Sequence, residues 1–144
     1  MTEHVRQKIL TALATRLTGL TTTGANVFRS RVYPLDTGQV PGLLIYAESE
    51  TVEPGSGRKS ERQLTIKIEG YAVGPAIDDI LDQIALEVEI AIAAEPTLSG
   101  LCKDLLLLTT QIEKSGEPNQ PMGLITLNFL AWYQAANGAP DQAL

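Results

Sequence analysis

Apolar and polar residues alternate most clearly between residues 62 and 72. The apolar positions there include Leu64, Ile66 and Ile68. Alternation with a period of two predicts a β-strand with one buried face. After Gly74-Pro75 the apolar residues recur every three or four positions, which predicts an amphipathic helix that ends near Pro96. Because the strand leads directly into this helix, we expect the helix to pack on the sheet that contains the strand.

Similar patterns predict one more helix and four more strands. The helix spans residues 3–20 with Thr2 as its N-cap, and the strands span residues 26–33, 43–47, 103–113 and 123–134. The run Leu105 to Leu108 indicates burial on both faces of its strand. The predicted order is α-β-β-β-α-β-β. This order is typical of an α+β fold, with two helices on one face of a largely antiparallel or mixed sheet of about five strands.

Two stretches carry no such periodicity. Residues 48–60 are polar and contain Pro54, Gly55 and Gly57, so we predict a long mobile loop that links two strands as an extended hairpin. Residues 135–144 are predicted to form a disordered C-terminal tail. The remaining pattern is continuous, and the length of 144 residues fits a single α+β domain at residues 1–134.

Composition and charge narrow the class of function. The net charge is −6, which argues against nonspecific binding to the nucleic acid polyanion. Cys102 is the only cysteine, so no intramolecular disulfide is possible, and a small buried thiol is the expected role. No apolar run approaches 18 residues, so we expect no membrane-spanning helix.

Residues suited to catalysis are few. His4 is the only histidine and lies far along the chain from Cys102, which gives no support for a Cys/His catalytic pair or a zinc site. Asp78, Asp79 and Asp82 could be read as a metal site, but acids in the first turns of a helix are explained by the helix dipole. We therefore expect no catalytic, cofactor-binding or metal-binding residues and no enzymatic activity. A monomeric ligand-binding domain or enzyme is the alternative, and it would require a concave pocket with converging polar groups.

Two apolar features do not fit a monomer. Leu86 and Ile90 lie four residues apart on the side of the second helix that faces away from its core stripe. The last strand is apolar on both faces, since Leu124, Leu130 and Trp132 share the face that two helices would leave uncovered. Both features indicate contact with another surface, which is a neighbouring subunit or, for the last strand, either a neighbouring subunit or the long loop at residues 48–60.

The chain resembles the tail terminator proteins of long-tailed bacteriophages, of which minor tail protein U of lambda-like phages and prophages is the nearest type. The resemblance covers residues 1–134 and rests on element order and pattern. It is carried by the first helix, by the strands at residues 27–34, 43–46 and 62–71, and by the helix with Asp79-Ile80-Leu81 and Glu87-Val88-Glu89.

The resemblance implies a structural role in the virion tail, after assembly in the bacterial host cytoplasm. Members of the family are monomers that form a hexameric ring on the tail tube, stop polymerisation of the tube protein and provide a surface for joining to the head. Their partners would be the tail tube protein and a head-completion protein, with DNA passing through the ring without specific binding. Another tail-completion or head–tail connector protein is the nearest alternative. The expected interface residues are Leu86, Ile90, Arg29, Arg31, Glu50, Glu53, Arg58 and Lys59.

Overall fold

The computed structural model of the protein describes residues 2–29 and 37–144. The helices are α1 (Val5–Leu17), η1 (Thr37–Gln39, a 3-10 helix) and α2 (Ile77–Ala93). The strands are β1 (Val27–Phe28), β2 (Gly42–Pro54), β3 (Lys59–Val73), β4 (Asp104–Glu117), β5 (Gln120–Ala136) and β6 (Ala139–Ala143). The predicted α+β class and the order of the predicted elements are confirmed, and β6 follows them as an additional strand.

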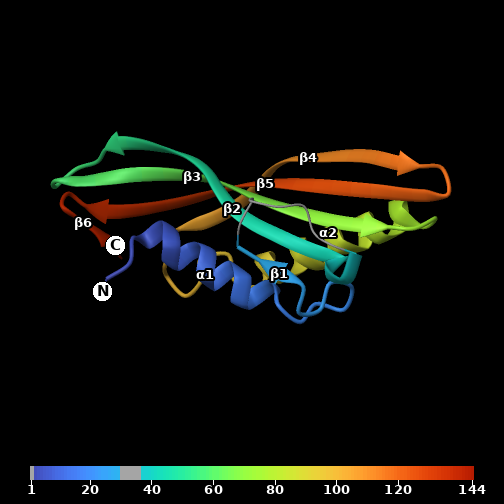
Figure 1. The fold of residues 1–144 in the computed structure, drawn as a ribbon. Coiled ribbons are helices and arrows are strands. Elements are labelled where there is room, and N and C mark those ends of the chain that lie inside the picture. Colours follow the sequence, from blue (N-terminus) through green and yellow to red (C-terminus); the bar gives the residue numbers. More distant parts are fainter. Residues whose placement is uncertain (1, 30–36) are drawn as a thin grey trace.

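The strands form one mixed sheet in the order β1-β2-β3-β5-β4, with β6 paired to β5 beyond the end of β4. Among the strands of the described residues, only β1 and β2 run parallel, and all the other pairs are antiparallel. Figure 1 shows α1 and α2 on the same face of the sheet, whose long hairpins extend toward its two ends. The opposite face of the sheet carries no helix in the described ranges.

Helix α2 packs closely on β3 and β5 because two glycines leave room for it. A Cβ atom added at Gly70 would lie 2.8 Å from Ile84 Cγ2, and one added at Gly123 would lie 2.8 Å from Leu81 Cδ1. Both distances are shorter than a van der Waals contact, so a side chain at either position would require Ile84 or Leu81 to shift from its packed position. The helix in turn buries the apolar stripe that the sequence predicted, which includes Ile84 and Val88.

Helix α1 begins and ends inside the predicted range. Its N-cap is His4 rather than Thr2, and His4 Nδ1 accepts a hydrogen bond from the backbone N–H of Arg6 at 3.1 Å. Its buried residues are Val5, Ile9, Leu13 and Leu17. The predicted apolar stripe is therefore confirmed, although the helix ends at Leu17 rather than at Leu20.

The predicted loop at residues 48–60 is wrong. This segment is the end of a β-hairpin, in which β2 continues to Pro54 and β3 starts at Lys59. The turn uses positive φ angles of 73° at Gly57 and 61° at Arg58, and the backbone N–H of Gly55 donates to Lys59 O at 2.8 Å. Backbone hydrogen bonds between the strands stabilise this polar part of the hairpin. Because such bonds do not require apolar side chains, the sequence shows no apolar period here.

The predicted C-terminal tail is also ordered. Strand β5 continues to Ala136, and β6 returns beside it with Ala135 opposite Ala143. The connecting residues are Asn137-Gly138, with a φ of 82° at Gly138, and this dipeptide is a strong hairpin signal. Lys8 Nζ donates to Asp141 O at 2.6 Å, which ties β6 to α1.

Candidate interaction surface

The exposed side of α2 carries the apolar pair that the sequence singled out. Leu86 is 51% exposed and Ile90 is 62% exposed. On the same helix, Glu87 accepts from the Thr22 hydroxyl at 2.7 Å and from Gln83 Nε2 at 2.9 Å. Burial alone would raise the pKa of the Glu87 carboxyl, but these hydrogen bonds outweigh it and hold the pKa below its ordinary value. Leu86 and Ile90 therefore stand beside a carboxylate that stays ionised.

The predicted arginine pair is only partly described. Arg29 follows the two-residue strand β1, is exposed, and donates from Nη1 to Thr11 Oγ1 at 2.6 Å. Arg31 lies outside the described residues, as do the last residues of the predicted strand at 26–33. In the described part of that stretch, only Val27 and Phe28 form a strand.

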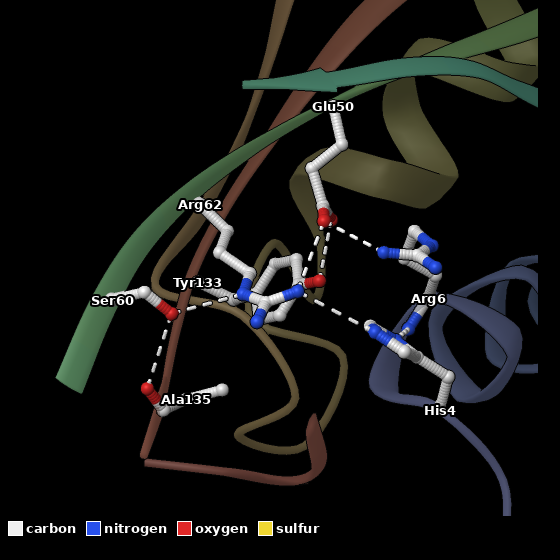
Figure 2. Close-up of polar contacts among 7 residues, drawn as sticks. All are labelled: His4, Arg6, Glu50, Ser60, Arg62, Tyr133 and Ala135. Carbon is white, nitrogen blue, oxygen red and sulfur yellow. Dashed lines mark hydrogen bonds and ion pairs between the residues drawn. The ribbon is translucent and has the colours of Figure 1, made fainter. Parts of the chain in front are cut away.

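Glu50 is directed into the molecule instead of toward solvent. Its side chain is 8% exposed, and Oε1 accepts from Arg6 Nη1 at 2.7 Å and from Arg62 Nη1 at 3.1 Å. Tyr133 donates its hydroxyl to Oε2, so the carboxylate joins α1, β2, β3 and β5 (Figure 2). Burial, together with the bond to Glu50, raises the pKa of Tyr133 to about 12. We call Arg6, Glu50, Arg62 and Tyr133 the Glu50 cluster.

His4 lies at the edge of the Glu50 cluster. Its Nε2 is 3.4 Å from Arg62 Nη1, and its Nδ1 accepts from the backbone N–H of Arg6. Burial and the positive charge of Arg6 lower the pKa of His4. Arg62 also donates from Nε to Ser60 Oγ at 3.0 Å, and the Ser60 hydroxyl donates to Ala135 O (Figure 2). These contacts organise the fold. An open pocket of about 300 Å³ lies beside them and is lined by Arg6, Ala47, Glu48, Ser49, Glu50 and Leu64. The Glu50 carboxylate at this pocket is already bound by Arg6, Arg62 and Tyr133.

The other predicted charged contacts are at the end of the β2–β3 hairpin. Glu53 and Arg58 are exposed and Lys59 is half-buried. The structure thus brings Glu53, Arg58 and Lys59 together and separates them from Leu86 and Ile90 on α2, because the hairpin and α2 extend toward different ends of the sheet (Figure 1).

Strand β4 carries an apolar surface that the sequence analysis missed. Burial on both faces was predicted at residues 105–108, but only Leu105 is buried, and Leu106 and Leu108 are 49% and 55% exposed. On the neighbouring strand, Trp132 is 41% exposed and its Nε1 donates to Glu61 Oε2 at 2.7 Å. Both helices lie on the other face of the sheet (Figure 1), so no described helix covers Leu106 and Leu108, and the run of leucines did not show this.

The described pockets are shallow. The one at the β4–β5 turn holds about 330 Å³ and is lined by Val73, Gly74 and residues 119–122. No ionisable side chain lines it, and the described residues contain no group of three His, Cys, Asp or Glu that could hold a metal ion. Cys102 is buried, as predicted, and burial together with the charge of Asp104 raises its pKa to about 11. In residues 2–29 and 37–144, no helix has the length and apolar character needed to cross a membrane.

Comparisons with known proteins give a structural match. No protein-family model matches the chain, and no curated protein does. Among solved structures, the fold is similar to that of a chain in the virion of a native gene transfer agent (GTA) particle, with a TM-score of 0.54 and 18% sequence identity. The match covers 92% of this chain and 92% of that chain. The two chains therefore share a fold along almost their whole lengths.

Proposed function

We propose that the protein is a structural component of a phage-type virion that acts as a tail terminator. In this role it forms a ring on the completed tail tube, stops polymerisation of the tube protein and provides the surface to which the head is joined. The observation that carries the proposal is the fold shared with a chain of the GTA virion over 92% of both chains. The element order that resembles tail terminators supports the more specific role.

The surface of α2 supports a role in assembly. Leu86 and Ile90 are more than half exposed and lie opposite the stripe that packs on the sheet. Because each side chain is already about half covered, covering the remainder of both contributes about 2–3 kcal/mol before ordering costs. That amount is useful in a ring, where the same heterologous contact is repeated by each subunit.

The test combines a gene deletion with two substitutions. Without the gene, the encoding phage or prophage should assemble tails of abnormal length that lack heads. Leu86→Asp and Ile90→Asp, each confirmed as folded by circular dichroism, should fail to restore normal tails. Leu144→Asp is the matched control, because Leu144 is also exposed, at 47%, but lies at the C-terminus away from α2.

Each outcome has a separate meaning. Normal tails from both α2 variants would remove α2 from the interface and leave the terminator role standing. Tails of normal length without heads after the deletion would favour a head–tail connector over a terminator. Normal, infectious particles after the deletion would contradict a role in the virion altogether.

A further inference from the structure

Strand β4 forms one edge of the sheet. Residues Asp104–Glu117 pair with β5 on one side, and no described strand pairs with the other side. A 14-residue edge is long for a strand that leaves its outer backbone groups unpaired, and such edges readily accept another strand.

The hydrogen-bond pattern shows which backbone groups point outward. Gly74 N–H donates to Pro121 O on the β3 side of β5, and Leu144 N–H donates to Gln134 O on the opposite side. Odd-numbered residues of β5 therefore face β3, and even-numbered residues face β4, because antiparallel bonding alternates along a strand. The β4 residues that lie opposite odd-numbered β5 residues form no backbone hydrogen bonds with them, so their N–H and C=O groups point away from the sheet. They include Leu105, Leu107, Thr110 and Ile112.

The side chains of this edge favour pairing. Residues 106–112 contain no charge, proline or glycine, which are the residues that normally prevent contacts between strand edges. Within this stretch, Leu106, Leu108 and Ile112 are 49%, 55% and 52% exposed. We call residues 106–112 the β4 edge segment.

A second free edge lies on β2. Strand β1 pairs only with Leu43 and Leu44, so in the described chain the outer side of residues 49–54 has no strand beside it. The hydrogen bond from Gly55 N–H to Lys59 O shows that the backbone groups of Gly55 face β3. Because the direction alternates along the strand, the backbone groups of Glu50, Val52 and Pro54 point outward. Val52 is 52% exposed, and Pro54 has no N–H, so outward pairing ends there. We call residues 49–54 the β2 edge segment.

We propose that the β4 edge segment pairs with the β2 edge segment of a second copy of this chain. Along the order β2-β3-β5-β4 every neighbouring pair is antiparallel, so β2 and β4 run in opposite directions. A second copy in the same orientation therefore places its β2 antiparallel to β4 of the first, which continues the alternation. Each copy then uses β4 on one side and β2 on the other.

This contact specifies how the proposed ring is built, and in that respect it rests on the proposed function. Because the two paired surfaces differ, the contact is heterologous and can close into a ring. A pairing of β4 with β4 across a two-fold axis would use both copies' β4 edge segments and stop at a dimer.

Proline substitutions can block each edge separately. Thr110→Pro and Val52→Pro remove N–H groups that point away from the chain's own ladder, so each variant should fold. Thr110→Val and Val52→Ile are the matched controls, since they keep the N–H group and the strand propensity. We expect each proline variant to need at least about a tenfold higher concentration for self-association, from the loss of pairing at one edge. Sedimentation velocity of the purified protein at high concentration, and electron microscopy of rings assembled on tail tubes, would measure this.

Mixing the two proline variants tests the direction of the contact. Thr110→Pro retains its β2 edge segment and Val52→Pro retains its β4 edge segment, so the mixture should form a 1:1 dimer and nothing larger. Rings from either proline variant alone would overturn the edge contact and leave the terminator role intact. Association that Thr110→Pro abolishes but Val52→Pro does not would establish pairing of β4 with β4 and overturn the proposal. Wild-type protein that forms no ring alone or on tails would overturn the proposed function as well.

Hydrogen exchange gives a test that does not depend on the folding of a variant. The outward N–H groups of Thr110 and Ile112 should exchange rapidly in the monomer and become protected in the ring. The inward N–H of Gln111 should be protected in both states. Unchanged exchange at Thr110 and Ile112 in the assembled wild-type ring would refute the pairing.

Discussion

Replacing Glu50 by alanine is the most direct test of what holds the β2–β3 hairpin against α1. The carboxylate accepts from two guanidinium groups and from the hydroxyl of Tyr133. Its removal leaves the Tyr133 hydroxyl without its acceptor and leaves Arg62, whose side chain is 16% exposed, without its counter-ion.

The expected loss follows from burial. Breaking a fully buried ion pair costs about 3–5 kcal/mol. The value here is reduced because the Arg6 side chain is 40% exposed and Arg62 keeps its bond to Ser60. Leaving a buried hydroxyl unsatisfied adds about 1–3 kcal/mol. We therefore expect Glu50→Ala to lower the free energy of unfolding by about 3 kcal/mol, which for a chain of this size lowers Tm by about 6–12 °C.

Glu48→Ala is the matched control, since it removes the same residue type from the same strand. Glu48 is 46% exposed and pairs with Lys67 at 2.9 Å, and an exposed pair of this kind contributes about 1 kcal/mol or less. Urea denaturation followed by circular dichroism would measure both variants. If Glu50→Ala lies within about 1 kcal/mol of Glu48→Ala, the Glu50 cluster does not hold the hairpin against α1.

Two further predictions test packing and pH dependence. Gly70→Ala should destabilise the protein by about 1–3 kcal/mol in urea denaturation, because the new Cβ would lie 2.8 Å from Ile84 Cγ2. Gly38→Ala is the control and should be neutral, since a Cβ atom there meets nothing within 4 Å. Equal stability of the two variants would contradict the close packing of α2. His4 has a lowered pKa in the folded state, so the unfolded chain binds the proton first as pH falls below about 6.5, and folding loses stability between that value and the folded pKa. His4→Asn keeps an N-cap acceptor but has no side chain that titrates in this range. The stability of wild type relative to His4→Asn should therefore fall as the pH is lowered from 7.5 to 5. A constant difference in stability over this range would contradict a lowered pKa of His4.

The elements that sequence analysis predicted are those whose burial leaves a period in the chain. Leu64, Ile66 and Ile68 alternate because β3 has one face on the core, and the stripe on α2 recurs because a single side of the helix is buried. The exposure of Leu86 and Ile90 was predictable for the same reason, since both residues fall off that stripe. Their role in an interface stays a prediction.

The parts that were not predicted depend on contacts between distant residues. Glu50 was grouped with surface charges, yet its partners Arg6 and Tyr133 are 44 and 83 residues away along the chain. No local pattern shows that these three side chains meet. The edge position of β4 was hidden in the same way, because four consecutive leucines predict burial on both faces unless the order of the strands is known.

The two free edges share a feature that limits how far copies of the chain could pair along them. The ladder between β2 and β3 shifts register between Ala47 and Ser49, and the ladder between β4 and β5 shifts between Leu107 and Thr109. The two shifts lie at the same level of the sheet, because Ala47 pairs with Ile66 and Leu107 pairs with Phe129, and Ile66 and Phe129 are opposite each other. A bulge increases the local twist and interrupts the outward row of backbone groups. Each edge is therefore divided into short runs, and the uninterrupted outward groups of the two edge segments are those of Thr110 and Ile112 on β4 and of Glu50 and Val52 on β2. A second copy can pair along these few residues but cannot extend a flat sheet indefinitely.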